Sequence, residues 1–239
     1  MTYPFIVVSG IIGAGKSTLC SHLYKEIGFP SKREPDKRVY PVEMYLERVE
    51  ENPYLKDYYE LVDLHQNTPY PRYQDDVKIK SDFACVAFEM QIHLLYSRYR
   101  QHQQIIWNLH REAAIQDRSI YEDQLFVNIL EKMGILDKRA VENYRHSLEI
   151  MSVHFRLPDL IIYLDITPET GMERKEIRGR DSEKAVFLEY QTMLKAEYDK
   201  WAWDMEKRTQ VEFVDWNEDN QKIEPILELI AEKMPDERR

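Results

Sequence analysis

The chain is short of cysteine and of positive charge, and it contains no long apolar run. Its two cysteines form no motif, so no disulfide framework is expected and a reducing, cytoplasmic compartment fits. The net charge of −10 argues against nucleic acid or an anionic membrane as a partner, because both bind basic surfaces. No apolar run is long enough to span a bilayer, and the first residues carry no secretory signal pattern. We therefore expect a cytoplasmic protein without a membrane or nucleic-acid partner.

The order of apolar runs predicts one α/β domain over residues 1–239, a length that suits a single core with insertions. Short β-branched runs predict strands at 5–8, 42–46, 113–116, 160–164 and 211–214. Helices are expected at 16–27, 52–61, 81–104, 120–133 and 137–155. Residues 62–80 have no clear period and are expected to form an irregular insertion. Alternating strands and helices predict a parallel sheet with helices on both faces and ligands at the carboxyl ends of the strands.

Glycine is also scarce, yet three of the seven glycines fall within residues 10–17. This stretch, Gly10-Ile11-Ile12-Gly13-Ala14-Gly15-Lys16-Ser17, fits the phosphate-loop pattern and lies between a predicted strand and a predicted helix. In such a loop the backbone N–H groups turn inward on a phosphate, the lysine reaches the outer phosphates, and the serine hydroxyl binds Mg²⁺. A chance match in a glycine-rich turn is the alternative. We expect ATP with Mg²⁺ to bind at Gly10, Gly13, Ala14, Gly15, Lys16, Ser17 and Thr18.

Charged side chains follow two of the other predicted strands. Glu47 ends the second strand, where a carboxylate can act as general base for an attacking hydroxyl; a solvated position in an acid-rich run is the alternative. Asp117 closes the third strand, and an aspartate there can hold Mg²⁺. Arg118 can fix the base carboxylate and bind phosphate oxygens, with a structural Asp–Arg pair as the alternative. These strand ends are therefore the candidate acceptor and metal positions.

A basic segment follows the fourth predicted strand. Arg174 and Arg178 are one helical turn apart and so point the same way, and Gly179 gives Arg180 a flexible connection. Guanidinium groups that converge on one anion suit a lid over a transferring phosphoryl group. A solvated basic face is the alternative, but the triphosphate site favours a lid over residues 174–184.

Four segments that occur in the right order make the chain resemble the deoxyribonucleoside kinases, the family of deoxyadenosine, deoxyguanosine and deoxycytidine kinases. They are residues 47–55, 87–98, 117–123 and 158–183. The likeness runs from Phe5 to about Trp201 and is interrupted by the predicted insertion. Arg48 stands where the family usually has proline. The resemblance implies a P-loop kinase fold, with the five predicted strands in one parallel sheet and an arginine-rich lid.

The resemblance also implies roles around the sugar. Glu47 takes the place of the general base, and Arg118 orients the reacting groups. Tyr59 matches the tyrosine beside the sugar, whose ring leaves no room for a 2′-hydroxyl, and Tyr58 is the competing assignment. Glu183 matches the residue that hydrogen-bonds the 3′-hydroxyl. An uncharged deoxyribonucleoside therefore fits the implied pocket.

Around the base, the resemblance gives Gln91 the place that pairs with the base edge, since an amide donates and accepts at once. Arg98 lies two turns further along the same helix face and is placed opposite Asp123, and Phe126 adds an aromatic wall. These donors and acceptors suit bases that carry an amino group. The implied order of preference is a purine deoxynucleoside first, deoxycytidine second and thymidine last.

The sequence thus predicts an enzyme of nucleoside salvage that transfers the γ-phosphoryl group of ATP to the 5′-hydroxyl of a deoxyribonucleoside. A nucleoside monophosphate kinase of the thymidylate type is the nearest rival, and a catalytically silent kinase-like subunit is the rival from another class. The family is generally dimeric, and the predicted helices within 81–104 and 120–155 are the candidate homodimer surface.

Overall fold

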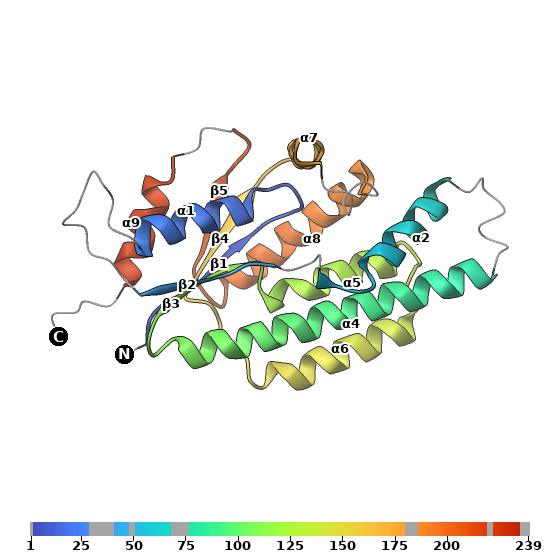
Figure 1. Ribbon diagram of the computed structural model, residues 1–239, viewed down its shortest axis with the longest axis horizontal. Helices are drawn as coiled ribbons and strands as arrows, with labels where there is room; N and C mark the ends of the chain where they lie inside the picture. The colour runs from blue at the N-terminus through green and yellow to red at the C-terminus, as the bar shows by residue number, and fades with distance from the viewer. Residues whose placement is uncertain are drawn as a thin grey trace.

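A computed structural model of the chain describes residues 2–28, 41–47, 51–67, 77–179, 186–218 and 222–234. Within these residues the strands are β1 (Phe5–Ser9), β2 (Val42–Tyr45), β3 (Ala113–Asp117), β4 (Leu160–Asp165) and β5 (Val211–Asp215). They form one sheet in the order β2-β3-β1-β4-β5, in which every neighbouring pair is parallel (Figure 1). The predicted α/β class with a parallel sheet is confirmed.

β1 lies at the centre of the sheet, and all of its residues are buried. A strand that is covered on both faces reads as a continuous apolar run, and this is why Phe5-Ile6-Val7-Val8 shows no alternation. Val8 is in register with Asp117 of β3 on one side and with Ile162 of β4 on the other. The segments that follow these three strands therefore leave the sheet at the same edge.

The helices alternate with the strands along the chain. Within the described residues they are α1 (Lys16–Gly28), α2 (Leu55–Asn67), α4 (Val77–Asn108), the short 3-10 helix η2 (Ile120–Glu122), α5 (Asp123–Lys132), α6 (Lys138–Ser152), α7 (Pro168–Arg178), α8 (Leu188–Glu206) and α9 (Glu224–Lys233). None of these helices is both long enough and apolar enough to cross a membrane.

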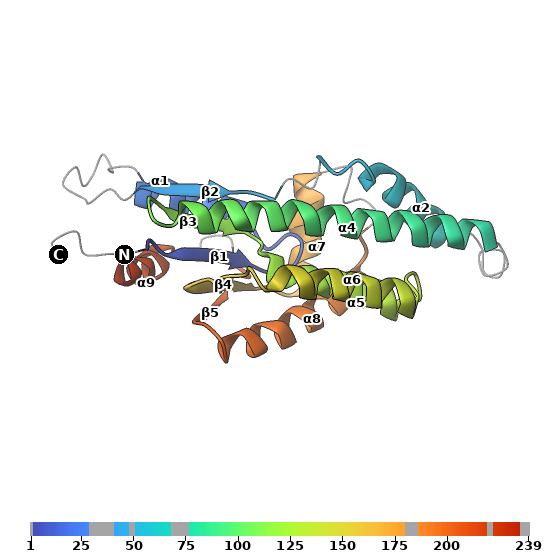
Figure 2. The same ribbon diagram turned by 90° about the horizontal axis from the view of Figure 1, so that it is seen from below.

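Helices cover both faces of the sheet. α1 and α9 pack on one face, and α4 and α8 cover the other, while α5 lies beyond the carboxyl ends of the strands (Figures 1 and 2). α4 has 32 residues and extends past the carboxyl edge of the sheet beside α2 and α6. There a second apolar core joins these helices, with Tyr58, Phe83, Leu95 and Tyr144 among its buried members. This second core holds the part of α4 that carries the predicted base-binding residues.

The boundaries differ from the prediction mainly between α2 and α4. α2 continues to Asn67 and α4 begins at Val77, so the prediction of an irregular stretch over 62–80 is wrong at both of its ends. The two helices pack against each other, and this tertiary contact extends both beyond their weak local signals. The remaining part, 68–76, lies outside the described residues. The single helix predicted over 120–133 is divided into η2 and α5.

Candidate active site

The phosphate loop connects β1 to α1 at the carboxyl edge of the sheet. Gly10, Gly13 and Gly15 all have positive φ angles, of 148°, 83° and 87°, which side chains with a Cβ rarely adopt. A Cβ on Gly13 would lie 2.2 Å from the carbonyl oxygen of Gly171 in α7, so the loop also lies close against this helix. Three glycines are therefore required by the path of the loop and by its packing.

Lys16 is the first residue of α1 and is buried. Its Nζ donates a hydrogen bond to the carbonyl oxygen of Ile11, at 2.9 Å, within the loop itself. Burial, and after it the positive charge of Arg118, lower the pKa of Lys16 to about 8. A phosphate bound next to this ammonium would raise the pKa of Lys16 again, because a nearby negative charge favours the charged form of the lysine.

The two predicted metal ligands are in direct contact. The Ser17 hydroxyl donates to Oδ2 of Asp117 at 2.5 Å, because β3 ends in register with β1 and thereby places Asp117 beside the start of α1. Oδ1 of Asp117 is buried and has no hydrogen-bond partner among the described residues. Magnesium is commonly held by one or two protein oxygens together with substrate phosphates, and this pair of oxygens fits that pattern.

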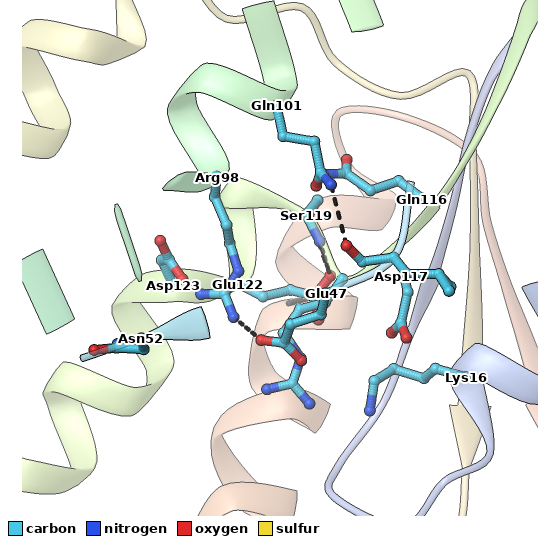
Figure 3. Close-up of polar contacts among 12 residues, drawn as sticks. Lys16, Glu47, Asn52, Arg98, Gln101, Gln116, Asp117, Ser119, Glu122 and Asp123 are labelled. Carbon is cyan, nitrogen blue, oxygen red and sulfur yellow. Dashed lines mark hydrogen bonds and ion pairs between the residues drawn. The ribbon is translucent and has the colours of Figure 1, made fainter. Parts of the chain in front are cut away.

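Glu47 lies two residues beyond β2, and its carboxylate contacts two arginines, of which Figure 3 labels Arg98. Oε1 accepts a hydrogen bond from Arg98, and Oε2 lies 3.6 Å from Nε of Arg118. Burial alone would raise the pKa of Glu47, but the charges of Arg118 and Arg98 lower it to about 2. Its side chain is 17% exposed, so Glu47 belongs to an interior charge cluster rather than to a solvated acidic surface.

Arg98 joins Glu47 to the start of α5. Its guanidinium lies between the carboxylates of Glu47 and Asp123 and forms an ion pair with each (Figure 3). Arg98 and Asp123 are both buried. Gln91 is buried two turns earlier on α4, at the helical spacing that puts it on the same face. The structure thus places Arg98 opposite Asp123, as the resemblance implies, and shows in addition that Arg98 is shared with Glu47.

Arg118 has a φ angle of 64° and is the only non-glycine residue of the described chain in the left-handed region. Its guanidinium lies 4.8 Å from the centre of the Phe126 ring and donates to the carbonyl oxygen of Gly10 at 3.4 Å. Burial opposes its charge, but the Glu47 carboxylate raises the pKa of Arg118 above the usual range. Phe126 therefore supports the arginine directly, in addition to the role at the base that the resemblance implies.

The two tyrosines of α2 differ in their surroundings. Tyr58 is buried in the second core, with its ring 5.7 Å from that of Phe83. Tyr59 is only partly buried and its ring lies edge-on to Tyr58 at 5.4 Å. A residue that contacts a sugar needs an accessible hydroxyl, so this difference favours Tyr59 over Tyr58 for that role.

The arginines of the predicted lid begin within α7. Arg174 donates to the carbonyl oxygens of Trp216 and Asn217, at 2.8 and 3.1 Å, and so ties α7 to the segment after β5. Arg178 lies in the last turn of α7, and Gly179 ends the helix in the left-handed conformation. The predicted site residues Arg180 and Glu183, and the lid beyond Gly179, lie outside the described residues, as does Arg48.

The sequence did not predict two residues that contact the phosphate loop or the residues next to it, Gln191 and Glu122. Gln191 of α8 is buried and donates to the carbonyl oxygen of Ile12 at 2.8 Å. Glu122, the last residue of η2, accepts hydrogen bonds from both Ser9 and Ser119. The spacing of Ser119 and Glu122 is that of a capping box, which is the local signal that identifies Glu122. No local pattern marks Gln191.

Comparison with known proteins connects this geometry to a family. The model of the deoxynucleoside kinase family matches residues 6–235. The chain belongs to the deoxynucleoside kinase family. It is thus a nucleoside kinase, an ATP-dependent phosphotransferase.

Relatives of known activity resemble the kinase along nearly its whole length. A deoxyadenosine kinase of Dictyostelium discoideum is 35% identical over 96% of this chain and 80% of its own length. A deoxyadenosine/deoxycytidine kinase of Bacillus subtilis (strain 168) is 29% identical over 98% of this chain and 94% of its own. The solved deoxyadenosine kinase from M. mycoides, with the products dCMP and a flexible dCDP bound, has a TM-score of 0.69 and 26% identity. That likeness covers 96% of this chain and 97% of the other.

Proposed function

We propose that this kinase transfers the γ-phosphoryl group of ATP to the 5′-hydroxyl of a deoxyribonucleoside, with purine deoxynucleosides preferred, deoxycytidine second and thymidine last. The names of its relatives support deoxyadenosine and deoxycytidine as acceptors. The observation that carries the proposal is the buried Arg98–Asp123 ion pair on the same side of α4 as Gln91. These groups offer donors and acceptors in a dry setting, where a base that leaves them unpaired is disfavoured.

The chemistry rests on the cluster at the carboxyl edge of the sheet. Glu47 accepts the proton of the 5′-hydroxyl, and its low pKa keeps it ionised at neutral pH. Arg118 and Lys16 supply positive charge for the moving phosphoryl group from positions that the sheet and the phosphate loop fix. Mg²⁺, held by Ser17 and Asp117, would neutralise phosphate charge when bound.

The other predicted site residues would contact the deoxyribonucleoside or ATP. Tyr59 lies beside the sugar, Glu183 bonds the 3′-hydroxyl, and Phe126 lies near the base. The phosphate loop, together with the lid arginines Arg174, Arg178 and Arg180, binds ATP. The lid spans 174–184 within one domain over 1–239.

The test is a kinase assay with MgATP against the four deoxyribonucleosides, their ribonucleoside counterparts and the matching monophosphates. Turnover of deoxyadenosine, deoxyguanosine or deoxycytidine, with weak turnover of ribonucleosides, is expected. Thymidine turnover well above that of deoxyadenosine would contradict the base assignment. Turnover of monophosphates alone would make the protein a monophosphate kinase, and ATP binding without any turnover would make it a silent subunit.

We also propose that the enzyme is a cytoplasmic homodimer that pairs through α4 and α6. These helices lie side by side, and Gln103 of α4 donates to the backbone of His154 just after α6. Three large apolar side chains of these helices are exposed, Tyr96 and Trp107 of α4 and Ile150 of α6, at 53%, 74% and 60%. An interface along the two helices would remove this apolar surface from water. Sedimentation should give twice the monomer mass for the wild type and the monomer mass for Trp107→Glu.

A further inference from the structure

The buried carboxylate of Glu122 lies next to the charge cluster of Glu47, Arg98 and Arg118, and the proposed chemistry gives it no role. Glu122 has no exposed surface and accepts four hydrogen bonds. Its Oε1 receives the Ser9 hydroxyl at 2.6 Å, the Ser119 backbone N–H at 2.8 Å and the Ser119 hydroxyl at 3.2 Å. Its Oε2 receives the Tyr198 hydroxyl at 2.8 Å. Burying a carboxylate is unfavourable, so a position needed only for packing would be filled by an apolar side chain.

The donors come from three separate elements that meet at the site. Ser9 is the last residue of β1 and directly precedes Gly10 of the phosphate loop. Ser119 directly follows Arg118. Tyr198 belongs to α8, and the centre of its ring lies 5.9 Å from the guanidinium carbon of Arg118. Glu122 therefore links the start of the phosphate loop, the residue after Arg118 and the aromatic ring beside the Arg118 side chain.

The backbone at Arg118 explains why such a link is needed. A left-handed φ of 64° is unfavourable for a residue with a long side chain and persists only where the surroundings enforce it. The N–H of Arg118 donates to the carbonyl oxygen of Val8 at 3.1 Å, which fixes the residue on its β1 side. The N–H of Ser119 donates to Glu122, which fixes the next peptide group. The strained turn is thus held on both sides.

We propose that Glu122 is a positioning residue that keeps Arg118 in its left-handed conformation and sets its place relative to the start of the phosphate loop. Glu122 acts through Arg118 and does not itself contact the reacting groups. The consequence for catalysis rests on the proposed function of Arg118, whereas the consequence for the backbone does not.

Two conservative variants separate geometry from charge. Glu122→Gln retains an oxygen for Ser9 and Ser119 and removes the charge, while Tyr198 turns its hydroxyl to accept from the new amide. Glu122→Asp retains the charge but withdraws the carboxylate by one methylene from its donors. A positioning role predicts that Glu122→Gln keeps at least about a third of kcat, and that Glu122→Asp loses about 30-fold, within the range for small misplacements. The KM for MgATP should change by less than about threefold in both, because the loss arises after ATP has bound.

The Arg118→Lys background supplies the control. If Glu122 acts through Arg118, the double variant Glu122→Asp/Arg118→Lys should have a kcat less than about twofold below that of Arg118→Lys alone. The effects of coupled residues do not add, because the second substitution removes an interaction that the first has already lost. The positioning role is overturned if Glu122→Asp keeps the wild-type kcat, if Glu122→Gln is the more damaged variant, or if the loss is as large in the Arg118→Lys background. A fall in melting temperature with kcat per folded molecule unchanged would also overturn it, because that pattern indicates packing alone.

A crystal structure of Glu122→Asp gives a readout that does not need activity. The φ angle of Arg118 should leave the left-handed region, or the Arg118 guanidinium should move away from Glu47. An unchanged Arg118 would refute the proposal whatever the kinetics. If the wild type phosphorylates no deoxyribonucleoside, the proposed function fails, and this structural test still decides the role of Glu122.

Discussion

Replacing Glu47 with glutamine tests the stability and the chemistry of the charge cluster in one variant. The substitution keeps the size of the side chain and removes the negative charge that Arg98 and Arg118 face. Although burial opposes ionisation, the cluster holds the pKa of Glu47 at about 2, against an ordinary value of 4.5. A difference of this size corresponds to about 3 kcal/mol of folding free energy at neutral pH, as an order of magnitude.

The sign of the pH dependence follows from the direction of this pKa. Because the pKa of Glu47 is lower in the folded state, its contribution is complete above about pH 4.5 and is lost as the pH falls toward about 2. Urea unfolding of the wild type and of Glu47→Gln should therefore differ by about 3 kcal/mol at pH 7. The difference should narrow by about 1 kcal/mol or more at pH 3.5.

The kinetic half of the experiment uses the same two proteins. Turnover of deoxyadenosine should fall by orders of magnitude in Glu47→Gln, while the Kd for MgATP, measured by calorimetry, stays close to that of the wild type. Glu43, an exposed residue of β2, provides Glu43→Gln as a matched control that should change neither quantity. Equal stabilities at pH 7, or a stability difference that does not shrink in acid, would refute the electrostatic argument. Near wild-type turnover would remove Glu47 from the role of base.

Three further substitutions or conditions test other parts of the site. Gly171→Ala would place a Cβ 2.8 Å from the carbonyl oxygen of Ile12, so the KM for ATP should rise by about tenfold. Gly134→Ala meets no atom within 4 Å but is strained by its φ of 69°, so it should lower stability and leave the KM for ATP unchanged. Lys16 has a pKa of about 8 and therefore loses its charge above about pH 8. The affinity for ATP, measured by calorimetry, should then fall by up to about tenfold for each pH unit above about 8. An affinity that stays constant up to about pH 9 would contradict this role of the Lys16 charge. Asp123→Asn removes the carboxylate that faces Arg98, and the ratio of kcat/KM for thymidine to that for deoxyadenosine should rise by about tenfold or more; an unchanged ratio would exclude this pair from base selection.

The central strands and the phosphate loop could be predicted because their signals are local. The apolar run at Phe5-Ile6-Val7-Val8 and the glycines that follow it each depend on neighbours in the sequence, and the structure reproduces both. The position of Asp117 also followed, because parallel strands end at the same edge and the register puts Asp117 beside Val8. Charged residues at the ends of predicted strands are thus the part of a site that a single sequence reveals best.

Contacts between distant elements could not be predicted in the same way. The bond from Gln191 to Ile12 joins residues 179 positions apart, and neither residue type indicates a role. The sharing of Arg98 between two carboxylates could not be predicted either. The resemblance implies Asp123 as its partner, and only the fold shows that Glu47 is a second one. The strain at Arg118 has no sequence signal either, since arginine is not a residue that favours the left-handed region.

The charged groups of the site share a feature that bears on how substrates bind. Lys16 donates to the carbonyl oxygen of Ile11, the Ser17 hydroxyl donates to Asp117, and Glu47 pairs with Arg98. Each of these three groups, all expected to contact a substrate or the metal, therefore has a protein partner of its own. Binding can then proceed by exchange of one polar partner for another, which costs far less than holding a buried charge without a partner. The depressed pKa of Glu47 has a related origin, because its charge is stabilised by Arg118, which the proposed reaction uses, and by Arg98, which is proposed to face the base. The interactions that stabilise the fold at this edge and those that would prepare it for phosphoryl transfer are, on this argument, largely the same set.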